Sequence, residues 1–122
     1  MKTVLVVDDS RIMRNIVKNT FTTLKISCQF LEAENGTKAF QLLETNKVNL
    51  ILLDWNMPGM DGMEFLKKVR AMPDYKELPI VMVTSESAKY NVIEALQCGA
   101  TDYIVKPIHE KVFMEKLSDI VF

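Results

Sequence analysis

The sequence LILLDWNMPGMDG, at residues 50–62, decides how the rest of the chain is interpreted. Four consecutive apolar residues, 50–53, run directly into an acid, Asp54, and two turn signals, Met-Pro-Gly and Asp-Gly, follow within the next eight residues. A short apolar run between turn signals is typical of a strand buried on both faces, as in a parallel sheet covered by helices. Asp54 is then expected at the carboxyl end of a central strand, where open α/β sheets bind their ligands. Taken alone, the stretch also fits a strand that ends in a polar residue capping the next turn.

The sequence around this stretch alternates between the periodicities of strands and helices. Short apolar runs predict strands at 3–7, 27–31, 50–53, 80–84 and 102–105. Apolar residues at helical spacing follow each strand and predict helices at about 12–24, 39–46, 63–72, 87–97 and 108–121. The inward faces of these helices are predicted to include Ile12, Ile16, Met72, Val112 and Val121.

Strict alternation of strands and helices with short loops predicts a single α/β domain over residues 1–122. The expected architecture is a flavodoxin-like (βα)5 three-layer sandwich, whose parallel five-stranded sheet has the order 2-1-3-4-5. In that order the first and third strands are neighbours, and their carboxyl ends flank a crevice.

The composition of the whole chain narrows the function classes. Of 122 residues, 48% are apolar and 25% charged, as in a soluble globular domain, and the net charge of −1 indicates neither a nucleic-acid nor a membrane partner. Cys28 and Cys98 have no metal-binding spacing and are interpreted as small buried hydrophobes of a reducing compartment. No apolar run approaches the ~18 residues of a membrane span, and the N-terminus is unlike a signal peptide, so the protein is predicted to be cytoplasmic.

Acidic residues stand at two of the predicted strand ends. Asp8 and Asp9 follow the first strand and Asp54 ends the third, so the three carboxylates are expected to converge at the crevice. Carboxylates this close repel one another, and a divalent metal is the usual means of offsetting their charge. Oxygen-only ligands beside a crevice with room for water and phosphate favour Mg²⁺ over Ca²⁺ or Zn²⁺. The alternative for Asp8 and Asp9 is capping of the next helix, although two acids exceed what one cap requires.

Two further strand ends carry complementary groups. Thr84 ends the fourth strand with a hydroxyl, and Lys106 ends the fifth with an ammonium. A hydroxyl and a cation facing a metal-bound carboxylate form a site for a phosphoryl group attached to that carboxylate, and aspartyl phosphates are a known class of covalent intermediate. Taken singly, Thr84 would be a strand-end turn residue and Lys106 a solvated surface lysine.

Five motifs make the sequence recognisable over its whole length: VVDDS, AENG, LLDWNMPGMDG, PIVMVTSE and GATDYIVKPI. In these motifs the chain resembles the receiver domain of two-component response regulators, and most of all the single-domain chemotaxis members of that family. The resemblance implies that Asp54 is the phospho-acceptor, that Thr84 and Lys106 contact the phosphoryl group, and that the Lys106–Pro107 peptide is cis. The Mg²⁺ ligands that it implies are Asp8, Asp9, Asp54 and the backbone carbonyl of Asn56.

The resemblance also implies a function and partners. A chemotaxis-type histidine kinase would donate the phosphoryl group, and the protein would catalyse only its own phosphorylation and dephosphorylation. Phosphorylation would draw Thr84 inward and let Tyr103, an aromatic switch residue, rotate. A monomer would then present the fourth helix, fifth strand and fifth helix to a flagellar motor switch protein, through Lys89, Tyr90, Val92, Tyr103 and Lys116. The alternative is that Tyr90 and Val92 pack on the sheet and leave only solvated lysines.

Other functions stay open at this point. The chain could be a receiver domain of a larger transcriptional regulator, although its end at the last helix favours a complete protein. It could also be a flavodoxin-like redox carrier, but that class needs a phosphate-cradling loop after the first strand, where this chain has two acids. The single histidine, His109, lies outside the acidic cluster and is interpreted as a surface residue at a helix start.

Overall fold

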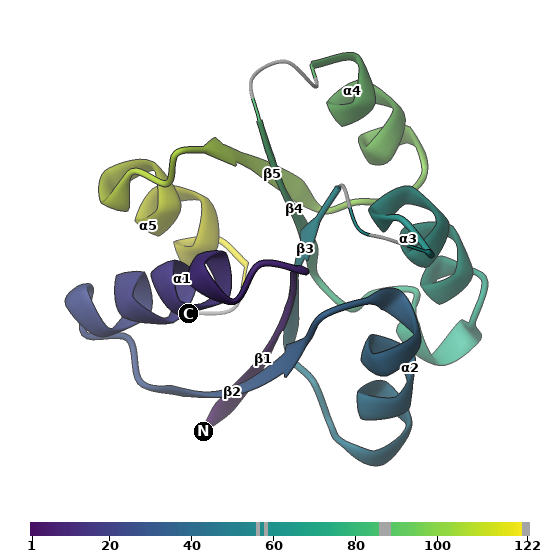
Figure 1. Ribbon diagram of the computed structural model, residues 1–122, viewed down its shortest axis with the longest axis horizontal. Coiled ribbons are helices and arrows are strands. Elements are labelled where there is room, and N and C mark those ends of the chain that lie inside the picture. The colour runs from purple at the N-terminus through teal and green to yellow at the C-terminus, as the bar shows by residue number, and fades with distance from the viewer. Residues whose placement is uncertain (56, 58, 86–88, 121–122) are drawn as a thin grey trace.

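A single parallel sheet forms the centre of the molecule. The computed structural model describes residues 1–55, 57, 59–85 and 89–120, and for 89–91 the backbone alone. Within these ranges five parallel strands pair in the order β2-β1-β3-β4-β5 (Figure 1). They are β1 (Lys2–Val7), β2 (Cys28–Ala33), β3 (Leu50–Asp54), β4 (Ile80–Ser85) and β5 (Asp102–Lys106). The flavodoxin-like order predicted from the sequence is confirmed, and β1 and β3 are neighbours.

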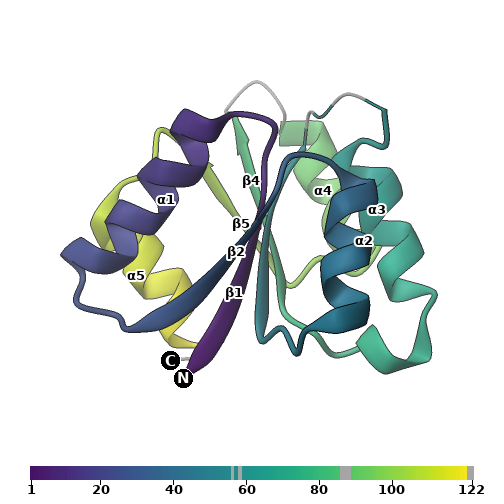
Figure 2. The ribbon, with the colours of Figure 1, turned by 60° about the horizontal axis from the view of Figure 1, so that its bottom comes forward.

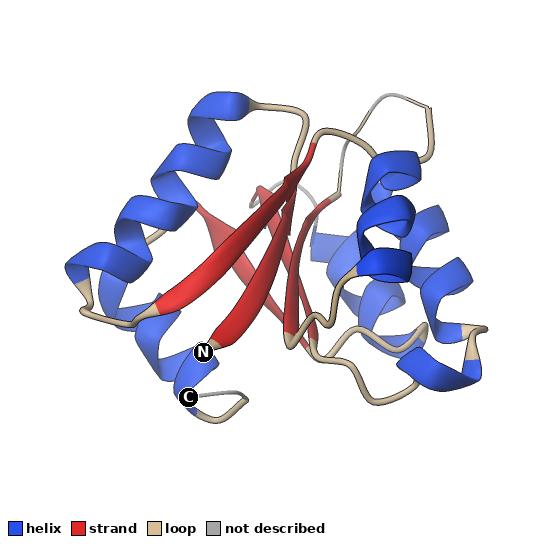
Figure 3. Cartoon of the chain, turned by 90° about the horizontal axis from the view of Figure 1, so that it is seen from below, coloured by secondary structure: helices blue, strands red, loops and turns tan. Residues whose placement is uncertain are grey.

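Helices cover the sheet on both faces, as Figure 2 and Figure 3 show. One face carries α1 (Arg11–Thr23) and α5 (Glu110–Ser118), and the other carries α2 (Gly36–Thr45), α3 (Gly62–Arg70) and α4 (Lys89–Gln97). A short 3₁₀ helix, η1 (Pro73–Tyr75), follows α3. None of the described helices is long and apolar enough to cross a membrane.

The strands divide the apolar core into two clusters because successive side chains of a strand point to opposite faces. Leu5, Ile51 and Leu53 belong to the cluster under α2, α3 and α4, and Val4 and Leu52 to the cluster under α1 and α5. Every residue of β3 is buried. The interpretation of residues 50–53 as a strand covered on both faces is therefore confirmed.

The inward face predicted for the first helix is wrong at two positions. Ile12 is 74% exposed and Ile16 41% exposed, whereas the face turned to the sheet carries Val17, Thr20 and Phe21. Thr20 can take an inward position because its hydroxyl donates to the carbonyl of Ile16 over 2.7 Å, which satisfies its polar group inside the helix. The apolar stripe therefore passes beside the two isoleucines instead of through them.

Other predicted core positions also lie at the surface. Met72 is 38% exposed and outside α3, because a residue before proline disfavours helical geometry and Met72 is extended. Val112 is 41% exposed, since the inward stripe of α5 begins one residue later, at Phe113. Val121 lies outside the described residues. Cys28 and Cys98 are free thiols that pack against the two core clusters but are only half-buried, so the prediction that they are buried hydrophobes holds in part.

Candidate functional site

Three carboxylates meet at the carboxyl ends of the two central strands. Asp8 and Asp9 follow β1, Asp54 ends β3, and one carboxylate oxygen from each lies within 4.8 Å of the others. Asp8 and Asp54 are buried, with exposed fractions of 4% and 7%, while Asp9 is exposed. The predicted convergence of the three acids is therefore present in the structure.

Asp8 is held at its backbone and at one carboxylate oxygen. Its amide donates to the carbonyl of Ala33 over 3.0 Å, and its Oδ1 accepts from the amide of Ser10 over 2.9 Å. Its carbonyl accepts from Nη1 of Arg14 over 2.6 Å. Ser10 also caps α1 through its own hydroxyl, which accepts from the Met13 amide. Capping of α1 is thus carried out by Ser10, which leaves the two acids available to the crevice.

Lys106 supplies a positive charge to this cluster. Its Nζ lies 3.0 Å from Oδ1 of Asp54 and 3.6 Å from Oδ2 of Asp8, and its side chain is 26% exposed. The lysine ends β5, and the peptide bond that follows it, to Pro107, is cis, as the family resemblance implied. Lys106 is therefore an ion-pair partner of the cluster and not a solvated surface lysine.

The pKa of each of the two buried acids is raised, because burial disfavours the charged form more than the neighbouring donors favour it. Burial is the largest cause that raises the pKa of Asp54, and it outweighs the hydrogen bond from Lys106, which lowers that pKa. Burial also raises the pKa of Asp8, against the hydrogen bond from Ser10, and the neighbouring charge of Asp54 raises it further. One ammonium does not balance three carboxylates. A hard divalent cation with oxygen ligands fits this donor set.

Thr84 is buried beside the acidic cluster. It is 2% exposed and lies one residue beyond Val83, which is the pairing partner of Asp54 in the β3–β4 register. Its hydroxyl donates to the carbonyl of Ser85 over 3.5 Å, which is long for a hydroxyl donor. A weakly held hydroxyl can turn to a better acceptor when one arrives.

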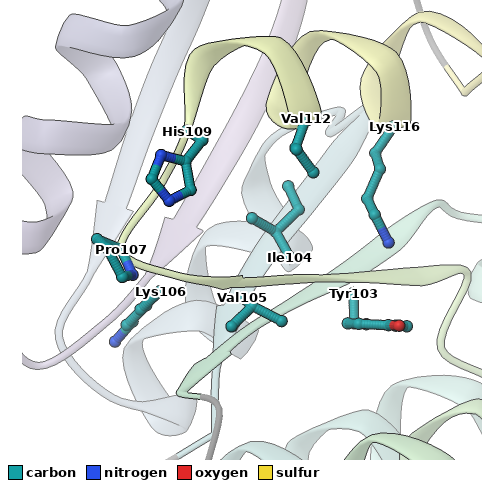
Figure 4. A pocket seen from close by; sticks show the side chains of 8 residues that line it. All are labelled: Tyr103, Ile104, Val105, Lys106, Pro107, His109, Val112 and Lys116. Atoms are coloured by element: carbon teal, nitrogen blue, oxygen red, sulfur yellow. The ribbon is translucent and has the colours of Figure 1, made fainter.

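A cavity of about 270 Å³ lies between β5 and α5 (Figure 4). Its lining runs from Lys106 and His109 at one end to Tyr103 and Lys116 at the other. Nζ of Lys116 lies 3.9 Å from the centroid of the half-buried Tyr103 ring and 3.0 Å from Oδ1 of Asp102. The same carboxylate oxygen accepts from the Tyr103 amide over 2.7 Å. Lys116 is thus already engaged by two groups on β5.

The surface predicted for partner binding is only partly as expected. Val92 is buried, with 8% exposure, so its expected place on an exposed surface is wrong: it is one of the inward residues of α4, as Ala95 is. The neighbouring Ile93 and Leu96 are exposed instead, at 58% and 41%. Asn56 and the side chains of Lys89 and Tyr90 lie outside what the structure describes. His109 is exposed at the N-cap of α5, as predicted.

Two polar residues of these sites, Arg14 and Asp102, were not predicted from the sequence. Arg14 contacts the Asp8 carbonyl and Glu32, and Asp102 pairs with Lys116. An arginine one helical turn after an acidic strand end is a usable signal for the first. Asp102 could have been found from its position at the start of the strand that ends in Lys106.

The chain is similar to proteins of known class. It matches the response regulator receiver domain family over residues 4–118. A chemotaxis protein CheY homolog of Campylobacter jejuni is 51% identical over 118 residues, which cover 96% of this chain and 90% of that protein. Chemotaxis protein CheY1 of Helicobacter pylori strain J99 is 48% identical, with 96% and 94% covered.

Solved structures agree with this likeness. Vibrio cholerae chemotaxis protein CheY4 superposes with a TM-score of 0.88 at 33% identity, and the match covers 99% of each chain. The Mn²⁺-bound form of response regulator Rcp1 superposes with a TM-score of 0.81 at 28% identity, covering 98% of this chain and 91% of that one.

Proposed function

This chain belongs to the response regulator receiver domain family, and on that premise we propose that it is a phosphorylation-activated switch whose phospho-acceptor is Asp54. It is a receiver domain of the CheY type, a class that acts in two-component signalling. Such domains bind Mg²⁺ at an acidic pocket and are generally not classical enzymes. We assign residues 1–122 to one receiver domain, an assignment that the family match over 4–118 supports.

The observation that carries this proposal is the pairing of buried Asp54 with Lys106 inside a group of three carboxylates. A carboxylate oxygen of Asp54 attacks the phosphorus of a phosphohistidine in a histidine kinase, so that an O–P bond forms as the N–P bond breaks. Lys106, 3.0 Å from Oδ1 of Asp54, offsets the negative charge that arrives. Attack of water on the aspartyl phosphate later breaks the O–P bond and releases phosphate.

We assign the metal site of the proposed switch to Asp8, Asp9, Asp54 and the backbone carbonyl of Asn56. When bound there, Mg²⁺ would supply positive charge to the phosphoryl oxygens. The role of the chain itself is to hold buried carboxylates close together, and the backbone bonds of Asp8 serve that role before any ligand arrives.

Thr84 and Tyr103 carry the change of state in this proposal. A phosphoryl group on Asp54 offers the Thr84 hydroxyl a charged acceptor in place of its long bond to Ser85. Movement of Thr84 opens space for Tyr103, on the adjacent strand, and shifts an existing equilibrium of its ring. The pairing of Lys116 with that ring makes the output surface sensitive to the rotation.

The proposed output is binding of a partner protein at the surface of α4, β5 and α5. On these elements the structure describes exposed Ile93 and Leu96 on α4, half-buried Tyr103 on β5, and exposed Val112 and half-buried Lys116 on α5, and we propose them as members of this surface. Lys89 and Tyr90 remain proposed members. Apolar and aromatic groups flanked by lysines suit an amphipathic or acidic peptide. Because its relatives are chemotaxis proteins, we propose a flagellar motor switch protein as the partner and a chemotaxis-type histidine kinase as the phosphoryl donor.

We further propose that the protein works as a monomer in the cytoplasm, without a nucleic-acid or membrane partner. The near-balanced net charge of −1 and the two free cysteines support this setting.

Intact mass spectrometry with acetyl phosphate tests the central claim. With Mg²⁺ present, the protein should gain the mass of one phosphate, and Asp54→Asn should gain none. Labelling that continues undiminished in EDTA would contradict the metal requirement. Labelling of Asp54→Asn would show that another residue is the acceptor.

A further inference from the structure

A guanidinium on the first turns of α1 bridges the acidic site to β2. The Arg14 side chain is 13% exposed, and its Nη1 donates to the carbonyl of Asp8 over 2.6 Å. Its Nε donates to Oε1 of Glu32 over 3.0 Å. The other carboxylate oxygen of Glu32 accepts from Nζ of Lys18 over 2.9 Å. One arginine therefore links α1, β2 and the segment after β1, with one end at the carboxylate cluster and the other at Glu32, which also pairs with Lys18.

The fold places each group of this bridge by strand register. Glu32 pairs with Val6 in the parallel β1–β2 ladder, and Ala33 pairs with Val7, the residue before Asp8. Because Val6 belongs to the apolar cluster under α1 and α5, Glu32 beside it also faces α1. The nitrogens of a guanidinium lie in one plane at fixed angles, so fixing Nε on Glu32 also fixes where Nη1 points.

We propose that Arg14 is a positioning residue of the metal site: bridged between Glu32 and the Asp8 carbonyl, it fixes the peptide from which the Asp8 carboxylate projects. This inference rests on the proposed Mg²⁺ binding. It adds a residue that supports the metal site without itself being a ligand. Asp8 makes three hydrogen bonds, at its amide, its Oδ1 and its carbonyl, and its Oδ2 lies 3.6 Å from Nζ of Lys106. The first two hydrogen bonds come from backbone groups, so the bond from Arg14 to the carbonyl is the only one of the three that a substitution of the partner's side chain removes.

A positioning role and a purely electrostatic role of Arg14 predict opposite changes in Mg²⁺ affinity when Arg14 is removed. Arg14 is a cation beside a site that takes a cation, so loss of its charge alone would tighten Mg²⁺ binding. Loss of its hydrogen bond to the Asp8 carbonyl makes the Asp8 carboxylate less well positioned as a ligand. Loss of a residue that supports a metal ligand in this way typically weakens metal binding about 10–100-fold. The sign of the change therefore separates the two roles.

The test is a Mg²⁺ titration of the full chain, followed by the fluorescence of Trp55 and by calorimetry. Trp55 is the only tryptophan and directly follows Asp54. Arg14→Ala is expected to raise the Mg²⁺ dissociation constant by about tenfold. The matched control is Lys18→Ala, which removes the other cation on Glu32 but no contact with Asp8. It should leave the dissociation constant unchanged.

Two further measurements separate positioning from general loss of structure. The amide resonance of Ser10, whose N–H donates to Oδ1 of Asp8, should shift in Arg14→Ala and stay in place in Lys18→Ala. Arg14→Lys keeps the charge but offers one ammonium in place of a two-ended fork, so it should also bind Mg²⁺ more weakly than the unmodified protein. Full recovery of affinity in Arg14→Lys would contradict the bridge.

Arg14→Ala that folds and binds Mg²⁺ as tightly as the unmodified protein, or more tightly, would overturn this inference. If the unmodified protein itself bound no Mg²⁺, the proposed function would fail instead. The two failures are therefore distinguishable in the same titration.

Discussion

Strand β5 carries a lysine–carboxylate pair at each end, and the two pairs have the same length but different surroundings. At the carboxyl end, Lys106 Nζ lies 3.0 Å from Oδ1 of Asp54, and at the amino end Oδ1 of Asp102 lies 3.0 Å from Nζ of Lys116. The lysine side chains are similarly exposed, at 26% and 24%. The acids differ, because the Asp54 side chain is 8% exposed and that of Asp102 34%.

This difference shows that burial of the acid, and not the length of the pair, decides what a pair can do. An exposed ion pair contributes about 0–1 kcal/mol because water and salt compete for both charges. Such a pair exchanges partners easily, which suits a binding surface. A buried carboxylate has lost its water, and burial raises the pKa of Asp54 despite its lysine. That carboxylate gains most from additional positive charge, which suits a site for a metal and a phosphoryl group.

The largest expected difference between the two pairs lies in the rate of phosphorylation. Lys106→Met should slow labelling by acetyl phosphate by about 10²–10³-fold, the usual cost of removing one donor that stabilises developing charge. The matched variant Lys116→Met should label at nearly the normal rate, because Lys116 pairs at the far end of the strand. Time-resolved intact mass gives both rates. Equal slowing of the two variants would show that Lys106 has no special role in phosphorylation.

The second-largest expected difference between the two ends of β5 lies in metal binding. If Mg²⁺ binds the folded acidic cluster alone, a concentration 100 times its dissociation constant raises the free energy of unfolding by about 2.7 kcal/mol. Urea unfolding with Mg²⁺ and with EDTA measures this increase. Asp9→Ala should lose most of it, whereas Asp102→Ala should keep it. An increase that survives in Asp9→Ala would place the metal elsewhere.

The pH dependence of stability should have opposite signs for Asp54, whose pKa is raised by burial, and for Glu32, whose pKa is lowered by its ion pairs. Asp54 has a pKa raised above its ordinary 3.8, so in EDTA the folded state binds more protons, and its contribution to the free energy of unfolding falls as pH rises through that window. Asp54→Asn should therefore become more stable than the unmodified protein as pH rises above about 4. Urea unfolding across a pH series measures this gap, and a gap that shrinks with rising pH would contradict the sign.

Glu32 provides the opposite case within the same series. Its hydrogen bond from Lys18 is the first cause that lowers its pKa below the ordinary 4.5, and Arg14 lowers it further. Its stabilising contribution is present above that ordinary value and is lost as pH falls through the lowered pKa. Glu32→Gln should therefore be less stable than the unmodified protein near neutral pH, with the difference vanishing in acid.

The smallest expected effect belongs to the pair of Lys116 with Asp102, whose acid is the more exposed of the two acids. Lys116→Met should change the free energy of unfolding by less than about 1 kcal/mol, because water reaches both half-buried side chains of the pair with Asp102 and the contact with the Tyr103 ring is also only half-buried. The ring signals of Tyr103 in NMR spectra should nevertheless shift, since the cation 3.9 Å from its centroid is gone. Unchanged ring signals would show that Lys116 does not influence Tyr103, the proposed switch residue.

The sequence was sufficient to predict the strands and the acidic cluster because both depend on short-range patterns. Residues 50–53 are apolar without a break, which happens in strands buried on both faces, and the strand order then brings Asp8 and Asp54 to one edge. The same reasoning predicted that Lys106 lies at that edge, although the distances of 3.0 and 3.6 Å to two acids required the structure.

Helix faces were harder to predict because a shift of one residue turns a side chain by about 100°. Ile12 and Val112 lie one such step from the buried stripe, and apolarity alone does not distinguish them from their inward neighbours. Thr20 is inward because its hydroxyl is satisfied by a backbone carbonyl, a fact that no hydrophobic pattern contains. Bridges between distant elements, such as that of Arg14 with Glu32, depend on register and were not predictable from spacing.

The β1–β3 pairing determines when the proposed metal site can form during folding. Asp8 and Asp54 stand far apart along the chain and meet only when Val4 to Val7 pair with Leu50 to Leu53. Mg²⁺ that binds after this pairing slows unfolding, and it speeds folding only if the pairing has already formed in the folding transition state. The dependence of the two rate constants on Mg²⁺ therefore reports when the two halves of the crevice come together.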